Sequence, residues 1–590
     1  MSLDALEKHR PRNLIIATSL IHFVIAGLLF KILLSIDSAW FFNPILYSFL
    51  SSSKEIHFKA IISHLVGLVP LTAVLIAIGR NKYELHGSAR FAYGWEFIKR
   101  YKKNVQGIFL GYLGKLKLIV DGDYHILIKA PTRAGKGVSW VVPIFFTWLG
   151  SIISIDIKEE NFYKTAGFRK RMGQDIHFLN FIAEDKHSDC FNVFDYMPED
   201  NANRISFLQK VSNFLAPTPP GGDPIWTGGA RKLFEGLALM AKDIPALTCS
   251  FGQIFRMLHT EQKTNEYLKD MIEEHEDILD PICKMNLYSF INLPEKTRGG
   301  VQEQLASTLN IFANPIIDAA TSNSSFDLRD IKYKKMSIYV AIPPASLVEL
   351  GPMVNLFFQM AIDLNLKVPK DRDPKYKHNC LFMMDEFTSV GYMETVARKI
   401  EFIAGYGIQL MLVAQGTAQL YAVYKQFAEH IEDNCDIKGY LTPNNTKTAN
   451  KLSEDLGTIT IEQKSTNRAW SGIFPKHENI SETKRPLMLP QEIKEMPPDK
   501  CLIFLKGLKA IYADRIFWYT DPRLKNNEFP PPKIPLLEVK QTLEIKAKMK
   551  TIEVDINDLE MPIYNKVRVL SDDESIACAE QYLNAIGEMA

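Results

Sequence analysis

Short apolar runs bounded by polar or turn-forming residues recur along most of the chain. Such runs are typical of strands buried on both faces of a parallel sheet, because covering helices exclude water from both sides. The sequence therefore predicts an α/β protein with strands at residues 124–129, 151–156, 336–342, 380–384 and 408–414.

The pattern changes between residues 196 and 330, where regular strand signals are missing. Apolar positions there follow helical spacing instead. The predicted helices are Ala230–Lys242, Phe255–His275 and Thr297–Phe312. We therefore expect an α/β domain in two parts, residues 81–195 and 331–525, separated by an all-α segment at 196–330.

Two long apolar stretches lie near the N-terminus, over residues 14–34 and 60–78. Each is long enough to cross a hydrocarbon layer of about 30 Å as a helix, although either would also suit a buried core helix. Lysine and arginine residues precede the first stretch and follow the second, while the loop between them has little positive charge. The positive-inside rule then predicts a membrane anchor over residues 1–80, with the N-terminus and the main domain in the cytoplasm.

Composition narrows the choice of function only slightly. The chain has 590 residues and a net charge of +1, so its overall charge does not indicate nucleic-acid binding. The seven cysteines are scattered and form no CxxC pair. This arrangement argues against a zinc site or a disulfide framework and suits a reducing cytosol.

The C-terminal tail, residues 526–590, has a composition of its own. It begins with a proline-rich hinge at residues 529–535, and from Glu553 to Ala590 it carries nine acidic residues and two basic ones. Such a tail would bind a basic partner or recruit cargo, or it would be a solvated tail without a specific role.

A glycine-containing loop follows the predicted strand at 124–129 and leads into a helical pattern. It consists of Ala130, Pro131, Thr132, Arg133, Ala134, Gly135, Lys136 and Gly137, with Val138 opening the helix. Strand, loop and helix in this order are the context of a phosphate-binding P-loop. Backbone N–H groups around Gly135 would point at the phosphates of ATP, and Lys136 would add a cation near the β- and γ-phosphates.

This loop departs from the general P-loop pattern at two positions. Ala130 replaces the first glycine, and Gly137 replaces the Ser or Thr that usually binds Mg²⁺. The loop alone is therefore a moderate signal.

Two acidic residues, Asp385 and Glu386, end the apolar run at 380–384. Beside a P-loop, Asp385 would hold Mg²⁺, through water, and Glu386 would orient or activate the attacking water. The other interpretation is a solvated strand end. Gln415 ends the run at 408–414, where it would either sense the γ-phosphate or cap the strand.

In order and spacing, these residues resemble the coupling proteins of type IV secretion, the TraG/TraD family, over about residues 10–525. The resemblance begins with His86-Gly-Ser-Ala-Arg90, the P-loop and Asp156-Ile-Lys-Glu-Glu-Asn161. It continues with Phe191-Asn-Val-Phe-Asp195, Trp226, Ala230 and Arg231, Asp385-Glu386-Phe387 with Gly391, and Gly405-Tyr-Gly407. It ends with Gln415, Gln419-Leu420, Arg485-Pro-Leu487, Tyr519 and Asp521-Pro522.

The chain also differs from that family at a few positions. Ile157 and Glu159 replace the proline and glycine of a D-P-K-G-E strand end, which leaves the turn geometry open, and Val193 replaces a proline. Glycine after the P-loop lysine is usual in this family, so Gly137 is a departure from the general pattern only.

The resemblance implies a RecA-like P-loop NTPase domain with an all-α insertion and an N-terminal two-helix transmembrane anchor. It also implies a homo-hexamer at the base of a secretion channel in the bacterial inner membrane, with ATP bound between subunits. A neighbouring subunit would supply an arginine to each site. Arg398 is one candidate, although it also suits a solvated helix surface.

We therefore expect a multi-pass inner-membrane ATPase that recruits effector proteins or relaxase–DNA complexes and drives or gates their transfer into the channel. A DNA pump of the FtsK/HerA kind would share the nucleotide chemistry, but it would favour a basic C-terminal module, whereas this tail is acidic. A membrane-anchored recruitment platform would use ATP structurally, and Ala130 is its best support. The sequence does not decide between protein and DNA as cargo.

Overall fold

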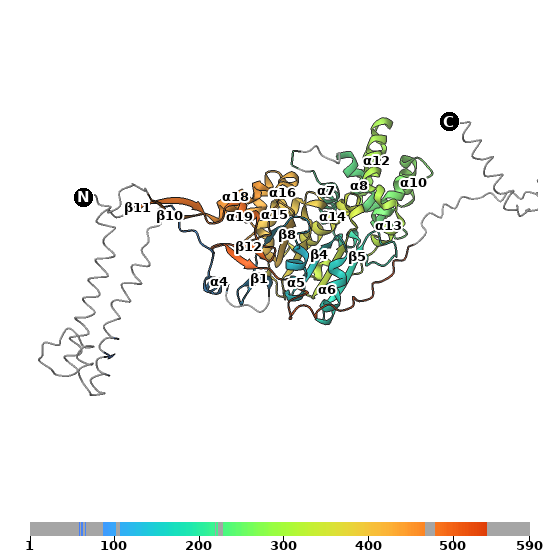
Figure 1. Ribbon diagram of the computed structural model, residues 1–590. Coiled ribbons are helices and arrows are strands. Elements are labelled where there is room, and N and C mark those ends of the chain that lie inside the picture. The colour runs from blue at the N-terminus through green and yellow to red at the C-terminus, as the bar shows by residue number, and fades with distance from the viewer. Residues whose placement is uncertain are drawn as a thin grey trace, which may run out of the picture.

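The computed structural model describes residues 86–101, 107–218, 220–221, 228–466 and 478–539, with four isolated helical positions between 58 and 65. Its centre is an 11-stranded sheet in the order β2-β1-β13-β12-β9-β3-β8-β7-β4-β6-β5. Figure 1 shows this sheet between helical layers, with a block of helices at one end and a two-stranded arm at the other.

The strands from β5 to β9 in this order pair in parallel and form the buried middle of the domain. They are β3 Ile126–Lys129, β4 Ser151–Asp156, β5 Asp175–Asn180, β6 Met336–Ala341, β7 Cys380–Met384, β8 Ile408–Ala414 and β9 Ile437–Tyr440. The five strands expected from the apolar runs are therefore confirmed. The runs are continuous because both faces of each strand are covered.

Strand β7 illustrates how the two faces are filled. Phe382 and Met384 pack into one hydrophobic cluster, and Leu381 and Met383 pack into a second cluster on the opposite face. The first face is covered by α14 Leu347–Asn365, α15 Glu394–Ile403, α16 Thr417–Tyr424 and α17 Phe427–Asp433. The second face is covered by α4 Gly94–Tyr101, α5 Val142–Thr147 and α6 Glu160–Arg171.

An antiparallel extension continues the sheet beyond β9. Its strands are β12 Lys500–Leu505, β13 Ile511–Asp514, β1 Ile108–Leu113 and β2 Leu116–Val120. Helices α18 Thr446–Leu456 and α19 Pro490–Lys494 pack together beside it. These strands were not predicted from the sequence, although residues 501–505 in β12 are an apolar run as long as that of β7.

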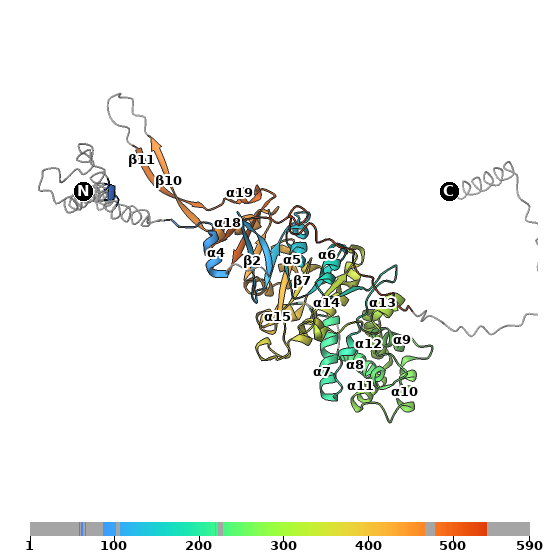
Figure 2. The ribbon, with the colours of Figure 1, turned by 90° about the horizontal axis from the view of Figure 1, so that it is seen from below.

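Among the described residues between Asn180 and Met336, seven α-helices follow one another and there is no strand. They are α7 Asn201–Leu215, α8 Gly228–Asp243, α9 Phe251–Leu258, α10 Thr264–Glu274, α11 Pro281–Ile291, α12 Glu295–Leu309 and α13 Pro315–Ala320. Figure 2 shows α8 to α13 as a block at the end of the sheet away from the arm.

The predicted single helix over Phe255–His275 is wrong. Two helices, α9 and α10, occupy this region, and the polar residues 259–263 separate them. Ser250 caps the start of α9 by accepting a hydrogen bond from the Gln253 amide. The break lets the buried residues of both helices face the block, since α9 contacts α8 and α10 contacts α11.

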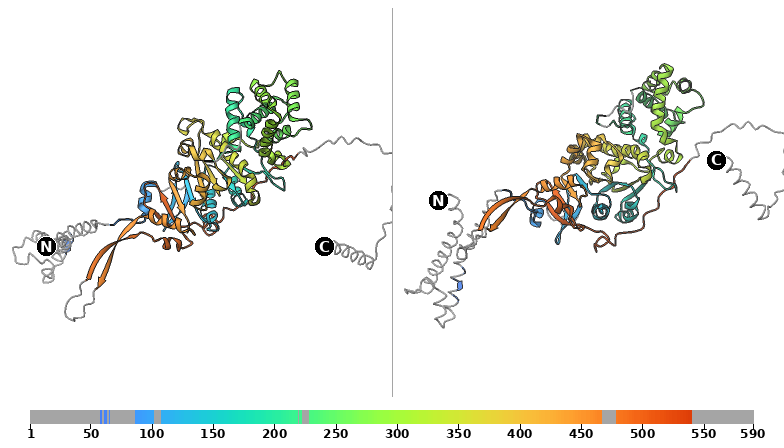
Figure 3. Two further views of the ribbon diagram at one scale, coloured as in Figure 1. Left: turned by 90° about the horizontal axis from the view of Figure 1, so that it is seen from above. Right: turned by 45° about the horizontal axis from the view of Figure 1, so that its top comes forward.

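A two-stranded antiparallel ribbon projects from the body near α18, formed by β10 Thr458–Thr466 and β11 Glu478–Pro486. Figure 3 shows it leaving the body at the end opposite to the helical block. At its base, residues just after the expected anchor run beside it, with a bridge from Ser88 to Ile459 and a hydrogen bond from the Ala89 amide to the Thr458 carbonyl.

The predicted proline-rich hinge is held against the body over its described length. The Phe529 ring lies 3.7 Å from the Arg171 guanidinium. The Leu537 amide donates to the Lys186 carbonyl at 2.8 Å, and the Leu537 side chain is buried in the core. Residues 529–539 therefore form a strap that starts at α6 and continues to the segment after β5, and the rest of the tail lies outside the described residues.

The predicted membrane spans at 14–34 and 60–78 lie outside the described residues, apart from Ile61, Ile62 and Leu65, which are helical. Within the described part of the chain, one helix, Pro344–Asn365, is long and apolar enough to cross a membrane. Its most apolar window is 67% buried inside the protein, as a core helix would be.

Glycine 167 tests how closely the strap is fitted. A Cβ at this position would overlap the backbone carbonyls of Phe529 and Pro530, which cannot move aside as a side-chain tip can. We expect Gly167→Ala to lower the free energy of unfolding by about 1–3 kcal/mol and to expose the strap to protease. Limited proteolysis and thermal melting measure both effects.

The matched control is Gly299→Ala in α12, where a Cβ would meet nothing within 4 Å. Alanine at an exposed helical position should leave stability unchanged or raise it by up to about 1 kcal/mol. Equal proteolysis of the two variants would contradict the close fit of the strap.

Candidate nucleotide site

The carboxyl ends of β3, β8 and β7 meet at one edge of the sheet, because these strands are parallel neighbours. The P-loop follows β3, Gln415 follows β8, and Asp385 and Glu386 follow β7. Ligands of open α/β sheets bind outside this edge. The fold therefore brings the residues predicted from separate parts of the sequence to one place.

The P-loop leaves β3 under tight backbone control. The Ala130 amide donates to the Ala414 carbonyl of β8 at 3.0 Å, and the Ala134 amide donates to the Pro131 carbonyl at 3.2 Å. Arg133 and Gly135 adopt left-handed conformations, with φ of 62° and 84°. Alternation of right- and left-handed residues turns successive amides toward one side and builds an anion-binding concavity.

The helix after the loop opens with a wide turn. Residues Gly137–Val141 form a π-helical turn in which the Val142 amide donates to the Gly137 carbonyl, and α5 follows. Pro143 has no amide hydrogen to continue an ordinary helix from residue 139. The wide turn accommodates the proline that made the predicted helical pattern imperfect.

Of the two departures from the general P-loop pattern, only Ala130 has a structural setting that accounts for it. Ala130 is fully buried beside β8. At Gly137, an added Cβ would meet nothing within 4 Å, so space alone does not explain the missing Ser or Thr.

Lys136 forms ion pairs with both acidic residues at the end of β7. Its Nζ lies 2.8 Å from Asp385 Oδ1 and also contacts Glu386 Oε1. Gln415 completes the cluster by donating from Nε2 to Glu386 Oε2 at 3.0 Å. The four residues proposed for catalysis thus form a chain of contacts. Lys136 contacts Asp385 and Glu386, and Glu386 contacts Gln415.

The charges of this cluster compete with burial. Burial by itself would lower the pKa of Lys136, but the two carboxylates outweigh it and the pKa is raised. Burial also raises the pKa of Asp385, and Lys136 offsets only part of that shift. Lys136, which faces two carboxylates, is therefore held as a cation, whereas at Asp385 burial outweighs the effect of the single lysine.

Glu386 is held in a strained backbone conformation, with φ of 55°. A left-handed conformation costs a residue with a side chain about 1–2 kcal/mol, and such strain is typical of functional sites. In this conformation both carboxylate oxygens of Glu386 accept hydrogen bonds, one from Lys136 and the other from Gln415.

The strand end of β4 adds a third acid near the cluster. Asp156 is buried and accepts a hydrogen bond from the Phe162 amide at 2.8 Å, at the start of α6. Burial raises its pKa to about 7, against the opposing effect of the Phe162 and Asn161 amides. Asp385 contributes a smaller rise.

The turn after Asp156 keeps the geometry of a glycine turn without the glycine. Glu159 stands at the position where the resembling family has glycine, and its φ is 58°. Its Oε1 accepts a hydrogen bond from Asn180 Nδ2 at 3.1 Å, which helps hold the strained residue in place. The turn geometry that the sequence left open is therefore left-handed.

The donor chemistry fits Mg²⁺ bound together with phosphate. Among the described residues, no group of three or more His, Cys, Asp or Glu side chains could hold a metal ion by itself. Magnesium sites of this kind use one or two carboxylates, with waters and substrate phosphates as the other ligands. Asp385, next to the P-loop, has a carboxylate of the kind that such sites use, directly or through water.

A second charged network, which was not predicted from the sequence, lies beside the P-loop. Lys129, the last residue of β3, is buried with its Nζ 2.6 Å from Glu432 Oε1 and 3.1 Å from Thr417 Oγ1. Lys451 contacts the other Glu432 oxygen at 3.1 Å. Burial lowers the pKa of Lys129, and Glu432 opposes that shift. In the sequence, the one sign of this network is that Lys129 stands in an otherwise apolar strand.

This network lies under a pocket of about 330 Å³ next to the P-loop. Pro131 and Thr132 from the loop and Gln415 and Gly416 from the end of β8 line it. Arg398, the candidate transition-state arginine, is on α15, where it is exposed and pairs with Glu394 at 3.1 Å. Trp226 lies outside the described residues.

The fold and this cluster have the arrangement of a P-loop nucleotide-binding domain, with the loop and the acids at the carboxyl edge of a parallel sheet. A profile of the family described as "Type IV secretory system Conjugative DNA transfer" matches residues 92–541, and the chain belongs to this family. The resemblance to type IV secretion coupling proteins is thus confirmed.

Two curated relatives are similar over most of the chain. Protein VirD4 of Rhizobium rhizogenes is 25% identical over 474 residues, which cover 78% of this chain and 69% of VirD4. Conjugal transfer protein TraG of Escherichia coli is 26% identical over 489 residues, which cover 77% of this chain and 75% of TraG.

Solved structures of the plasmid coupling protein TrwB share the fold. The complex of TrwB with ADP and Mg²⁺ matches with a TM-score of 0.55 at 14% identity and covers 73% of this chain and 96% of TrwB. The complex with the non-hydrolysable analogue ADPNP has the same TM-score and identity and covers 77% and 99%.

Asp156 makes stability depend on pH. Its folded-state pKa of about 7 lies above the ordinary value of 3.8, so the folded protein holds the proton more tightly than the unfolded chain. Its stabilising effect is complete below about pH 4 and is lost as the pH rises through 7. Since one pKa unit corresponds to about 1.4 kcal/mol, the loss is on the order of a few kcal/mol.

We expect Asp156→Asn, which keeps an oxygen to accept the Phe162 amide, to flatten the pH profile of thermal melting between pH 4 and 8. At pH 8 the variant should melt at a higher temperature than the parent protein. Parallel melting profiles of the two proteins would show that Asp156 is ionised in the folded state across this range.

Proposed function

We propose that this protein is an ATP-hydrolysing coupling protein of a type IV secretion system. The observation that carries the proposal is the chain of contacts from Lys136 through Asp385 and Glu386 to Gln415, at the carboxyl edge of a RecA-like sheet. Membership of the conjugative DNA transfer family supplies the biological setting.

Lys136 is placed to exchange partners during the reaction. It pairs with the Asp385 and Glu386 carboxylates. When ATP binds, its phosphates attract Lys136. Asp385 and Glu386 are then released from the ion pair and can act on Mg²⁺ and on the attacking water. Residues Ala130–Val138 then wrap the phosphates with backbone amides.

Each member of the cluster has a distinct role in hydrolysis. Asp385 holds Mg²⁺ through water, and Mg²⁺ when bound neutralises charge on the phosphate oxygens. Glu386 orients the attacking water and accepts its proton. Gln415 fixes the Glu386 carboxylate and senses the γ-phosphate from the neighbouring strand end.

The proposed assembly is a homo-hexamer at the base of the secretion channel. Residues 1–80 anchor it in the bacterial inner membrane with two spans and a cytoplasmic N-terminus, and residues 81–195 and 331–525 form the nucleotide domain. The all-α insertion, residues 196–330, and the part of the tail, residues 526–590, that follows the strap are the proposed contact regions for substrates. These are effector proteins or relaxase–DNA complexes.

The names of the relatives support this role. TraG is a conjugal transfer protein, and one VirD4 relative from Bartonella quintana is a "type IV secretion system-coupling protein", 24% identical over 415 residues. The structures of TrwB with ADP and Mg²⁺ and with ADPNP support nucleotide and Mg²⁺ binding at the corresponding site.

Variants of the cluster test the proposal in the full-length protein purified in detergent. We expect Lys136→Ala to weaken Mg·ATP binding at least 10-fold and to abolish hydrolysis, because the cation that binds the phosphates is lost. Glu386→Gln should bind ATP with nearly normal affinity but hydrolyse it at least 100-fold more slowly. Nucleotide binding and phosphate release are measured with and without single-stranded DNA.

Lys164→Ala is the matched control, since Lys164 pairs with Glu160 on the surface of α6. It should behave as the parent protein does. Stimulation of the parent by DNA would favour DNA transfer, and hydrolysis indifferent to DNA would favour protein cargo. Nucleotide binding without hydrolysis in the parent protein would contradict the proposed enzyme and leave a recruitment platform in its place.

A further inference from the structure

Arg515, which directly follows β13, reaches the P-loop from a position 380 residues later in the chain. Its Nη2 donates to the carbonyls of Ala134 at 2.8 Å and Gly135 at 3.1 Å. Its Nε and Nη2 both donate to Ser139 Oγ, at 3.0 and 2.8 Å.

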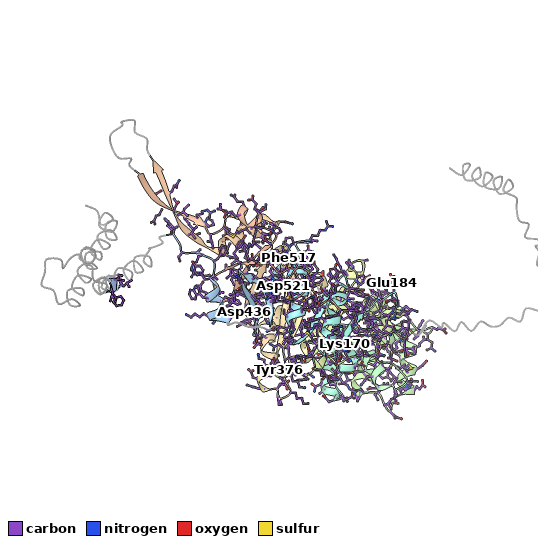
Figure 4. The ribbon with its side chains drawn as sticks, turned by 60° about the horizontal axis from the view of Figure 1, so that its bottom comes forward. Lys170, Glu184, Tyr376, Asp436, Phe517 and Asp521 are labelled. Carbon is purple, nitrogen blue, oxygen red and sulfur yellow. The ribbon has the colours of Figure 1, made fainter. Side chains whose placement is uncertain are left out.

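The other end of the guanidinium is tied to the antiparallel extension of the sheet. Nη1 donates to the Pro498 carbonyl at 2.6 Å, and the Arg515 amide donates to the Asp499 carbonyl at 2.8 Å. The guanidinium also lies 5.2 Å from the Phe517 ring, and Figure 4 labels Phe517 together with Asp521 in the same segment. These contacts fix the Arg515 side chain independently of its contacts with the P-loop.

The contacts with two successive carbonyls dictate where the amides point. A trans peptide is planar, with its C=O and its N–H on opposite sides. The peptide that carries the Ala134 carbonyl also carries the Gly135 N–H, and the next one carries the Lys136 N–H. Because both carbonyls face Arg515, both N–H groups face away from it, toward the concave side of the loop.

Glycine 135 is required for this contact as well as for its backbone angle. With φ of 84°, it occupies a conformation that residues with side chains rarely adopt. A Cβ at this position would also lie 2.6 Å from Arg515 Nη2. The single glycine of the loop before Lys136 is thus where the guanidinium approaches the backbone.

The charge of Arg515 is also available to the site. Within the described part of the chain, no carboxylate lies in ion-pair distance of this side chain, although it is half-buried. Burial lowers its pKa from the ordinary value of 12.5, yet an arginine remains protonated at neutral pH. A positive charge therefore stands directly behind the amides that would face phosphate.

We propose that Arg515 is a positioning residue for nucleotide binding, which holds the Ala134 and Gly135 carbonyls so that the Gly135 and Lys136 amides face the phosphates. It acts through the loop backbone and does not touch the nucleotide. This inference rests on the proposed nucleotide site. It adds that the P-loop is set from the C-terminal part of the domain, through the strand pair β12 and β13.

Binding of ADP with Mg²⁺ to the full-length protein in detergent tests the proposal. We expect Arg515→Ala to raise the Kd for Mg·ADP at least 10-fold, because the two amides lose their fixed direction. Arg515→Lys, which has no planar fork to engage both carbonyls and Ser139, should give an intermediate loss. In steady-state hydrolysis of ATP, KM should rise more than kcat falls, since bound nucleotide restores the loop.

Arg523→Ala is the matched control, because Arg523 belongs to the same segment but pairs with Asp521 at 3.1 Å. It should change the Kd for Mg·ADP less than 2-fold. Ser139→Ala removes the hydroxyl that orients the guanidinium and should raise the Kd about 3-fold. It serves as the deciding variant, with Arg515→Lys, if Arg515→Ala does not fold.

The outcomes separate this inference from the proposed function. A parent protein that does not bind Mg·ADP would overturn both. A parent that binds it, with Arg515→Lys and Ser139→Ala equally tight, would overturn only the role of Arg515. A lower melting temperature of the nucleotide-free variants with unchanged Kd and KM would likewise show a purely structural arginine.

Discussion

The parallel pairing of β3 with β8, and of β8 with β7, is the constraint on which the rest of the site depends. It aligns three carboxyl ends, so that loops far apart in the sequence start side by side. The hydrogen bond from Ala130 to Ala414 carries this alignment one residue into the P-loop. Lys136 and Gln415 can then both reach Glu386, which stands at the end of the next strand.

Several residues at this edge of the sheet have strained backbone conformations. Arg133, Glu159 and Glu386 all have left-handed φ values, at 62°, 58° and 55°. At about 1–2 kcal/mol each, these conformations persist because strands with both faces buried fix the chain on their N-terminal side. Among the described residues, three of the five non-glycine residues with positive φ thus lie at this edge; the other two are Lys186 and Lys425.

Much of the fold could be predicted because burial on both faces leaves a continuous apolar run. The strands Ser151–Asp156, Cys380–Met384 and Ile408–Ala414 have the predicted bounds. The ribbon strands escaped prediction because they lack a continuous apolar run, whereas β12 was missed although its run at residues 501–505 is mostly buried. The helix predicted over residues 255–275 failed because packing against two different neighbours divided it.

For the candidate site, local chemistry was readable and long-range contacts were not. Lys136, Asp385 and Glu386 stand out because a P-loop and a strand ending in two acids are local patterns. Arg515 and Glu432 have no such signature, and Lys129 was marked only by its place in an apolar strand. Each of their contacts joins residues about 300 or more positions apart.

The sequence by itself determined the class of fold, the position of the P-loop and the acids that accompany it, because strand burial and turn residues act over a few neighbouring positions. Only the tertiary structure decided the order of the strands, the left-handed turn at Glu159 and the hold of Arg515 on the loop. The physical reason is that these depend on which distant backbones pair, and pairing is settled by the packing of the whole sheet.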